Sequence, residues 1–208
     1  MDIFVIIYLL IVGFLIGLSG ALIPGPLLAF TIKESLKKGK HTGIFVIIGH
    51  MIVEIIIISL ILVGLMSYMS SHLFISIVSV TGGIVLILTA LALLREYKNP
   101  SKVIDKQYTY SSTIGGIVFT IFNPSFPIWW ATAGNRLLLE GLKIAGFFGM
   151  LLLVIGHWIA DFSWYYFVSF SVAHGRKKIV DDSVYKSIIL ILVGFLFLFG
   201  IYFLISGI

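Results

Sequence analysis

The sequence has no cysteine and few charged residues, and both shortages narrow what the protein can be. Without cysteine there are no disulfides, thiolate metal ligands or thiol-shuttling mechanism. Charged residues make up only 11% of the chain, whereas hydrophobic residues make up 60% and the mean hydropathy is +1.15. Soluble domains carry about 25% charged residues. The composition therefore excludes an ordinary soluble domain and predicts that lipid is the main solvent of the chain.

Six long stretches of the chain carry almost no charge. They cover residues 3–32, 43–66, 73–94, 108–135, 144–173 and 188–208. Each is long enough to cross a bilayer, because a helix needs about 20 residues to span the hydrocarbon core. We expect the first stretch to be retained, since Asp2 replaces the basic start of a signal peptide and the apolar run is too long for one. The predicted fold class is an all-α integral membrane protein with six transmembrane helices.

The basic residues predict how these helices are oriented. Twelve of them occupy the gaps after the first, third and fifth stretches, and only Arg136 and Lys143 occupy the other gaps. The twelve are Lys33, Lys37, Lys38, Lys40, Arg95, Lys98, Lys102, Lys106, Arg176, Lys177, Lys178 and Lys186. Because basic residues are held on the cytoplasmic side, we expect a multi-pass protein of the cell membrane with both termini extracytoplasmic. Topology thus explains the net charge of +5, and no nucleic-acid partner is expected.

Two patterns recur in the same order and indicate two related halves. An interrupted span, then a span with a G-H-x-x-x-acid pattern, then a plain span occurs twice. The interruptions are Ile23-Pro24-Gly25-Pro26 and Asn123-Pro124-Ser125-Phe126-Pro127, and the acid patterns run from Gly49 to Glu54 and from Gly156 to Asp161. Three spans per half force the second half to enter the membrane inverted. We predict a three-helix repeat at 1–94, a polar cytoplasmic linker at 95–107 and an inverted repeat at 108–208, with helices 1 and 4 broken.

The spacing of the two interruptions places them at matching depths. Pro24 lies nine residues before Lys33, and Pro127 lies nine residues before Arg136. Nine residues of helix rise about 14 Å, which is near the middle of a hydrocarbon core about 30 Å thick. His50, ten residues beyond Lys40, lies at a similar depth. The four motifs are therefore expected to converge near the midplane.

A helix that is interrupted inside the membrane frees backbone groups that can bind a solute. Proline removes an amide donor, and glycine lets the backbone leave helical geometry. Irregular backbone is tolerated at this depth only where protein or a wet cavity satisfies it. The alternative is that the prolines only kink the helices for packing. The candidate solute contacts in the two breaks are Pro24, Gly25, Pro26, Asn123, Pro124 and Pro127.

Glu54 and Asp161 are the strongest individual candidates for a functional site. A carboxylate at the centre of a transmembrane helix costs roughly 2.5 to 3.5 kcal/mol, so an interaction must compensate for it. His50 and His157 each lie four residues earlier on the same helix face, within reach of the acid. These groups are predicted to contact a transported proton, ion or solute. The alternative is a pair of structural contacts that lock the two helices to their neighbours.

The tryptophans and several glycines have more ordinary explanations. Two roles remain open for Trp158, which is next to His157: it either lines a pocket or anchors the helix at the membrane interface. The other tryptophans, Trp129, Trp130 and Trp164, are expected to be interface anchors. Small residues let helices approach closely. The glycines expected to do so are Gly13, Gly17, Gly20, Gly82 and Gly83.

The motifs resemble those of a known family. The residues Gly20-Ala21-Leu22-Ile23-Pro24-Gly25-Pro26 before a basic turn, with Asn123-Pro124 in the second half, look like the lysine exporter and homoserine/threonine exporter (LysE/RhtB) family. The resemblance covers essentially the whole chain in length, span count and placement of both breaks. It implies a secondary exporter of amino acids or similar small polar solutes, coupled to an ion gradient, for which we expect the proton. The matching positions are Pro24, Gly25, Pro26, Asn123 and Pro124.

Two other functions remain open at this point. Two imidazoles and two carboxylates would suit Mn, Fe, Ni or Zn, which makes a divalent metal-ion exporter an alternative with His50, Glu54, His157 and Asp161 as ligands. A membrane enzyme, or an electron carrier with haem between His50 and His157, is less favoured because the sequence has no H-E-x-x-H pattern and no nucleotide-binding glycine loop. We expect no enzyme and no cofactor. The expected partners are a small-molecule or ion substrate and the lipid bilayer, and a homo-oligomer is left open.

Overall fold

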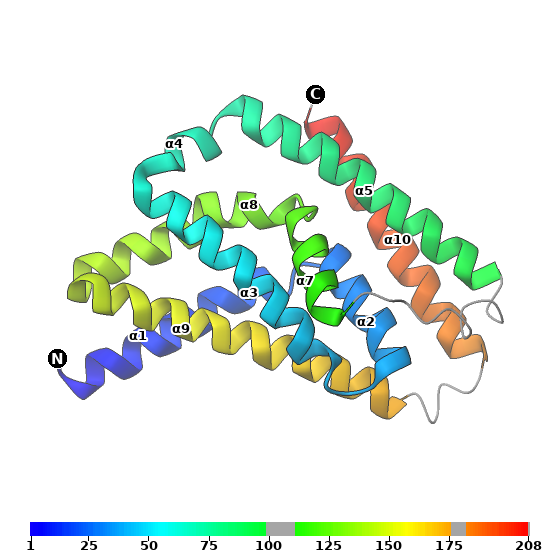
Figure 1. The fold of residues 1–208 in the computed structure, drawn as a ribbon, viewed down its shortest axis with the longest axis horizontal. Helices are drawn as coiled ribbons and strands as arrows, with labels where there is room; N and C mark the ends of the chain where they lie inside the picture. The colour runs from blue at the N-terminus through cyan, green and yellow to red at the C-terminus, as the bar shows by residue number, and fades with distance from the viewer. Residues whose placement is uncertain (99–110, 176–181, 208) are drawn as a thin grey trace.

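The computed structural model describes residues 1–98, 111–175 and 182–207, and all regular structure in these ranges is helical (Figure 1). Five helical segments in these ranges are long and apolar enough to cross a membrane, and a shorter apolar helix spans Ser112–Ile121. The five are Ile3–Ala21, Thr42–Met69, His72–Arg95, Ser125–Gly175 and Ile189–Ser206. The prediction of an all-α integral membrane protein is confirmed. The arrangement of six spans as two inverted repeats stays a prediction.

The first predicted interruption is present between helices α1 (Ile3–Ala21) and α2 (Pro26–Lys38). Helix α1 begins where the Asp2 carboxylate accepts a hydrogen bond from the backbone N–H of Phe4 at 3.2 Å. Helix α2 begins with Pro26, at a position where the missing amide donor costs nothing, after Gly25 in extended geometry. The chain therefore leaves helical geometry at the proline motif.

The second interruption separates α7 (Ser112–Ile121) from α8 (Ser125–Trp129). The side chain of Ser111 caps α7 by accepting from the N–H of Ile114 at 3.2 Å. In the break, the Asn123 side-chain oxygen accepts from the N–H of Ser125 at 3.2 Å, which starts the next helix. The short π-helix η2 (Trp130–Gly134) then leads into α9 (Asn135–Gly175).

Glycines bend the two longest helical segments. In the first, α3 (Thr42–Leu60) continues through the π-helix η1 (Ile61–Leu65) into α4 (Met66–Met69), and Gly64 adopts a φ of 92° that favours glycine. In the second, α9 is kinked at Ala145 and at Gly146, whose φ is 60°. This kink lies at the start of the fifth predicted span, just beyond the predicted gap at 136–143.

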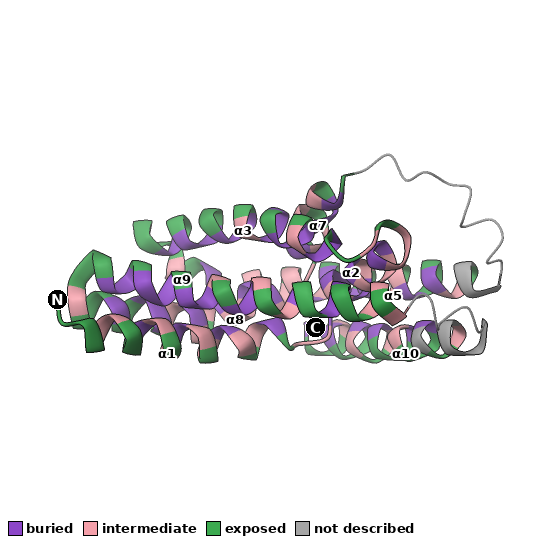
Figure 2. Cartoon of the chain, turned by 90° about the horizontal axis from the view of Figure 1, so that it is seen from below, coloured by how far each residue is buried: buried purple, intermediate pink, exposed green. Residues whose placement is uncertain are grey.

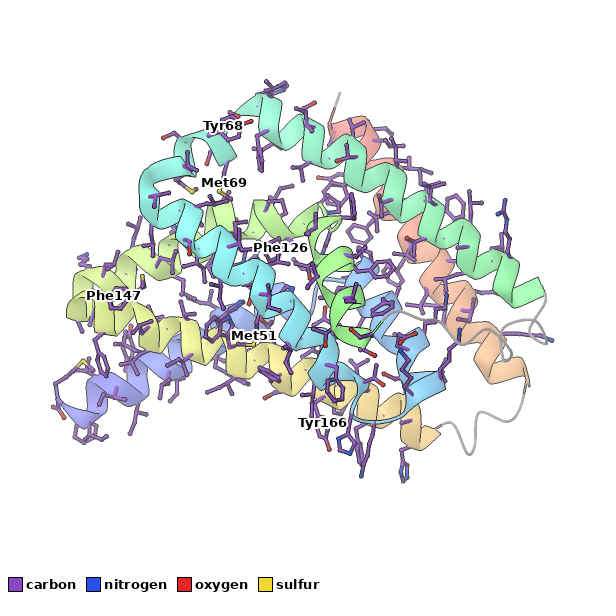
Figure 3. All side chains as sticks on the ribbon, in the orientation of Figure 1. Met51, Tyr68, Met69, Phe126, Phe147 and Tyr166 are labelled. Carbon is purple, nitrogen blue, oxygen red and sulfur yellow. The ribbon has the colours of Figure 1, made fainter. Side chains whose placement is uncertain are left out.

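The remaining helices, α5 (His72–Lys98) and α10 (Asp182–Ser206), pack along each other as a pair. Helix α1 packs along α9, and α3 packs along α7 (Figure 1). Buried faces point between the helices and exposed faces point outward (Figure 2). In the same way, Phe126 lies in the interior while Phe147 and Tyr166 lie on the outside (Figure 3). Exposed aromatic and aliphatic side chains are expected where lipid is the solvent.

Glycines bring the paired helices into backbone contact, as predicted for Gly13 and not for Gly49. A Cβ at Gly13 in α1 would lie 2.2 Å from the carbonyl oxygen of Leu153 in α9. A Cβ at Gly49 in α3 would lie 2.0 Å from the carbonyl oxygen of Thr113 in α7. These contacts tolerate no larger side chain, and they hold the His/acid helices against the first halves of the broken spans.

Parts of the predicted organisation lie outside the described residues. The linker at 95–107 falls mostly there, as do Lys102, Lys106 and the basic residues 176–178. The boundaries at 94 and 108, and the extracytoplasmic placement of the termini, stay predictions.

Candidate functional site

Four ionisable side chains meet in the centre of the helical bundle. Helix α3 supplies His50 and Glu54, and helix α9 supplies His157 and Asp161. Their exposed fractions are only 9%, 1%, 2% and 2% respectively. Within each helix the four-residue spacing brings His50 Nε2 to 3.2 Å from Glu54 Oε1, and His157 Nε2 to 3.3 Å from Asp161 Oδ2. The intrahelical pairing expected from the sequence is therefore present.

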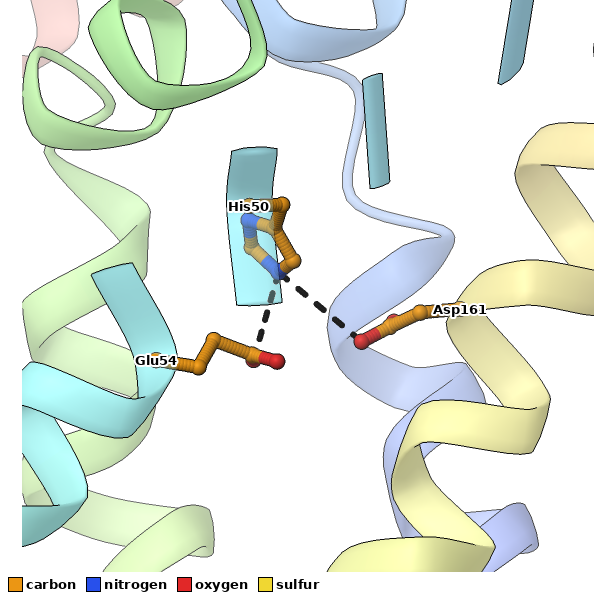
Figure 4. A group of neighbouring side chains, drawn as sticks. All are labelled: His50, Glu54 and Asp161. Atoms are coloured by element: carbon orange, nitrogen blue, oxygen red, sulfur yellow. Dashed lines mark ion pairs between the residues drawn. The ribbon is translucent and has the colours of Figure 1, made fainter. Parts of the chain in front are cut away.

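The pairs also contact each other, which the sequence did not predict. His157 Nε2 lies 2.8 Å from Glu54 Oε1, closer than it lies to the acid on its own helix. His50 Nε2 lies 3.8 Å from Asp161 Oδ2 (Figure 4). The four side chains thus form one cluster in which each imidazole faces both carboxylates, and we call it the His/acid cluster.

Glu54 is surrounded by hydrogen-bond donors. Trp158 Nε1 donates to Oε2 at 2.9 Å, and Trp130 Nε1 donates to Oε1 at 3.3 Å, where His157 also binds. Indole N–H groups can only donate, so they stabilise a carboxylate that accepts. This environment favours ionised Glu54, because the donors replace the water that burial removes.

Asp161 has a different environment. Its Oδ2 is buried and has no hydrogen-bond partner in the described part of the chain. Its nearest charged-group contacts are the two imidazoles, at 3.3 and 3.8 Å. An ionised carboxylate without donors is costly to bury, whereas a protonated one is far less so. The geometry therefore favours a proton or another cation at Asp161.

Thr120 in α7 determines which nitrogen of His50 carries a hydrogen. The Thr120 hydroxyl donates its only hydrogen to the Gly116 carbonyl oxygen at 2.7 Å. It must therefore accept from Nδ1 of His50, which lies 2.8 Å away. The Nε2 atom of His50 then faces the carboxylates either as the second donor of an imidazolium or as a free lone pair. Both forms suit a site that exchanges a cation.

His157 has no equivalent hydroxyl. Among the described residues its Nδ1 has no hydrogen-bond partner, and Gly17 of α1 lies against it. A Cβ at Gly17 would lie 2.7 Å from that nitrogen. One face of the ring stacks on Trp129 at a centroid distance of 4.9 Å. The neutral form that donates only from Nε2 to Glu54 fits these surroundings, because it buries no unpaired N–H.

A cavity of about 40 Å³ joins the His/acid cluster to both helix breaks. This volume suits an ion or a water molecule, and an amino acid is too large for it. Larger cavities of about 610 and 450 Å³ are lined by other residues. The residues that line the small cavity are Gly20, Ala21, Ile23, Leu27, His50, Glu54, Asn123, Ser125, Phe126, Trp129, Trp130, His157, Asp161 and Tyr165.

The residues predicted from the breaks divide into two groups. Asn123 lines the cavity, and its amide lies beside Gly25, so the two breaks touch each other. Pro24, Gly25, Pro26 and Pro127 do not line it. Pro124 packs closely against Gly82 of α5, where a Cβ would lie 2.7 Å from the proline ring. Packing thus accounts for the ring of this proline, and backbone contacts to a solute stay a prediction for the residues of both breaks.

The predicted role of two tryptophans was wrong. Trp130 is fully buried against Glu54, and Trp129 lines the cavity, so neither is an interface anchor. The reason is that the turn at Asn123 directs the end of α8 and the start of η2 inward. Trp158, left open above, belongs to the site. Thr120 and Tyr165 were not predicted as site residues. The repeat offered a signal for Thr120, which stands seven residues before Pro127, just as Gly17 stands seven residues before Pro24.

The donor set also fits a divalent metal ion. His50, Glu54 and Asp161 each offer one ligand atom, and these atoms lie within 4.8 Å of one another. Imidazole and carboxylate together suit Mn, Fe, Ni or Zn. The cluster is therefore suited to a small cation, whether a proton or a metal ion.

The comparison with protein families agrees with the resemblance noted from the motifs. The model of the LysE type translocator family matches residues 18–207. That range contains both helix breaks and all four residues of the His/acid cluster. No curated protein and no solved structure matches the chain. A match over nearly the whole chain shows that this protein belongs to the LysE type translocator family.

Proposed function

We propose that the protein is a secondary exporter of amino acids or similar small polar solutes, and that the His/acid cluster carries a coupling proton. Family membership supports transport across a membrane. The observation that carries the proposal is the cluster itself, in which each of two buried imidazoles lies 2.8 to 3.8 Å from both buried carboxylates, beside two helix breaks. Ionisable groups in this position are characteristic of proton and ion pathways.

The two carboxylates are proposed to have different roles. Glu54 accepts three donors and stays ionised, which holds a negative charge in the cluster. Asp161 Oδ2 has no hydrogen-bond donor among the described residues, and Asp161 is the carboxyl that binds and releases the proton. The imidazoles of His50 and His157 lie between the two acids and can transfer a proton from one side of the cluster to the other. Asp161 would then be protonated from one side of the membrane and deprotonated to the other.

The solute is proposed to bind between the two breaks after the halves separate. The cavity of about 40 Å³ is lined from both breaks, by Ile23 and by Asn123 and Ser125. Separation of the halves would enlarge this cavity and expose backbone groups of both breaks to the solute. Rocking of inverted repeats around a fixed central site would then alternate access.

The direct test is transport by the purified protein in proteoliposomes with an imposed pH gradient. The probes are a panel of amino acids and, separately, Mn²⁺, Fe²⁺, Ni²⁺ and Zn²⁺. We expect at least one amino acid to move against its gradient, and the Asp161→Asn variant to lose this while still exchanging solute for solute. The matched control is Glu140→Gln, which changes an exposed acid elsewhere on α9.

A divalent metal-ion exporter is the second candidate, favoured by the 4.8 Å grouping of His50, Glu54 and Asp161. In that case His50→Ala should be as damaging as either carboxylate change, and metal binding should weaken below about pH 6 as the imidazoles protonate. Titration calorimetry with Mn²⁺ or Zn²⁺ measures both effects. The haem alternative has no support, because a cavity of about 40 Å³ has no room for a macrocycle.

A further inference from the structure

Polar side chains join three helices at one end of the bundle, away from the His/acid cluster. On α2, Glu34 is 3% exposed and lies 2.5 Å from Nζ of Lys38. Ser112 of α7 donates to Glu34 at 3.4 Å, and Ser35 of α2 shares a hydrogen bond with Ser169 of α9 at 2.7 Å. We call these five residues the polar joint: Glu34, Ser35, Lys38, Ser112 and Ser169.

Apolar side chains join the helices at the opposite end, beyond the cluster. These residues are all at most 2% exposed and belong to one core cluster. We call them the leucine joint: Leu9 of α1 with Leu137, Leu138, Met150 and Leu153 of α9.

Three residues of each joint occupy matching positions in the sequence. Ser112 stands fifteen residues before Pro127, and Leu9 stands fifteen before Pro24. Likewise, Leu137 and Leu138 follow Pro127 at the distances at which Glu34 and Ser35 follow Pro24. If the halves are inverted repeats, the same structural positions close the two ends of the path, with polar residues at one end and leucines at the other.

The two joints differ in the free energy needed to separate their helices. The Glu34–Lys38 ion pair lies within α2, so Glu34 keeps its charged partner when α2 moves away from α7. Among the described residues, the hydrogen bonds that cross the polar joint each have a serine hydroxyl on at least one side, and water can replace them. Water cannot replace the contacts between leucines, because separation would expose apolar surface.

We infer that, in the protein without solute, the polar joint is the gate that opens and the leucine joint is the barrier that stays closed. Lys33, Lys37 and Lys40, which predict the cytoplasmic side, lie at the polar end. An exporter must load from that side, so the inference assigns Glu34, Ser35, Ser112 and Ser169 to its loading gate. This inference rests on the proposed function only in one respect, namely that solute is loaded from the cytoplasmic side.

The absence of cysteine makes the test direct, because a single introduced cysteine is the only thiol. Thr31→Cys places it one turn inside the polar joint, and Val154→Cys places it on α9 between Met150 and His157. Both native side chains are buried, at 0% and 4% exposure. The measurement is the rate at which a water-soluble maleimide labels each variant of the purified full-length protein without solute.

We expect Thr31→Cys to react faster than Val154→Cys. Adding Ser169→Ala removes one hydrogen bond across the polar joint and should raise Thr31→Cys labelling about fivefold, with no rise at Val154→Cys. The matched change at the other end, Leu138→Ala, should raise labelling of Val154→Cys and not of Thr31→Cys. Glu34→Gln, like Ser169→Ala, should raise the rate at which Thr31→Cys is labelled.

Equal or faster labelling of Val154→Cys in the unmodified background would overturn the inference. So would an equal rise at both cysteines after Ser169→Ala, which would indicate general loosening, or no rise at either. Labelling does not require transport, so its result is independent of the proposed function. Failure to transport any amino acid would leave the gate assignment standing and remove only its link to export.

Discussion

The two His/acid motifs share one sequence pattern but lie in unequal surroundings. His50 donates to Thr120, whereas His157 faces Gly17 and has no partner for Nδ1 among the described residues. Glu54 accepts from two indoles and an imidazole, whereas Asp161 Oδ2 accepts no hydrogen bond from them. A repeated pattern therefore does not imply repeated roles, and the neighbours decide which carboxyl keeps its charge.

The inequality follows from which side chains the two halves contribute. Trp130 stands three residues after Pro127, and Leu27 stands three after Pro24. Trp158 follows His157, and Met51 follows His50. Leucine and methionine supply no N–H donor. The second half therefore provides both indole donors to Glu54, and the first half offers none to Asp161 from the same positions.

The largest expected effect on stability is that of Glu54→Gln. The amide nitrogen would face indole or imidazole donors, and a buried charged network would lose its acceptor. We expect unfolding to become easier by about 3 to 5 kcal/mol, measured by denaturation of the purified protein in detergent. Glu140→Gln, at an exposed site, is the control. A Glu54→Gln variant as stable as this control would show that the donors do not depend on the carboxylate.

A smaller loss is expected from Gly17→Ala. The added Cβ would lie 2.7 Å from Nδ1 and 2.8 Å from Cα of His157, so α1 or the imidazole must shift. Overpacking of this kind costs about 1 to 3 kcal/mol. Gly194→Ala, in α10 with nothing near its Cβ position, is the matched control in the same unfolding assay. An unchanged stability would mean that the His157 side has room for a hydroxyl-bearing neighbour like Thr120.

Thr120→Val should have a still smaller effect on stability and a distinct one on function. The change removes the hydroxyl that accepts from His50 and keeps the shape of the side chain, which costs about 1 kcal/mol. Thr120→Ser retains the hydroxyl and should restore transport as well as stability. Equal transport by the valine and serine variants would refute a role for Thr120 in orienting His50.

The smallest effect on stability is expected from Asp161→Asn. If Asp161 is protonated in this conformation, the amide is nearly isosteric, and stability should stay within about 0.5 kcal/mol of the parent. An ionised Asp161 paired with both imidazoles would instead make the variant less stable by about 3 kcal/mol or more. The unfolding assay used for Glu54→Gln therefore distinguishes an ionised Glu54 from a protonated Asp161.

Local rules in the sequence predicted much of the fold. Proline lacks an amide donor, so both breaks could be located, and a four-residue spacing places each histidine beside its acid on a helix. The bends at Gly64 and Gly146 were not predicted as such, because a glycine in an apolar run carries no local signal that its φ becomes positive. Tertiary packing decides where a long apolar segment bends.

The site was predicted less completely, for a related reason. The 2.8 Å contact of His157 with Glu54 depends on how α3 and α9 are rotated toward each other. The inward position of Trp130 depends on the turn at Asn123, whereas the general tendency of tryptophan is to lie at the interface. Sequence patterns identified which helices carry the chemistry, and only the packed structure shows that the two pairs form one cluster.

The most direct test of the coupling role of Asp161 is solute-driven proton movement in proteoliposomes. An amino-acid substrate from the transport panel is added to one side, and internal pH is followed with a trapped dye. We predict proton movement with the parent protein and none with Asp161→Asn, although the variant still exchanges labelled for unlabelled solute. Equal proton movement in parent and variant would contradict the account, because Asp161 would then not carry the coupling proton.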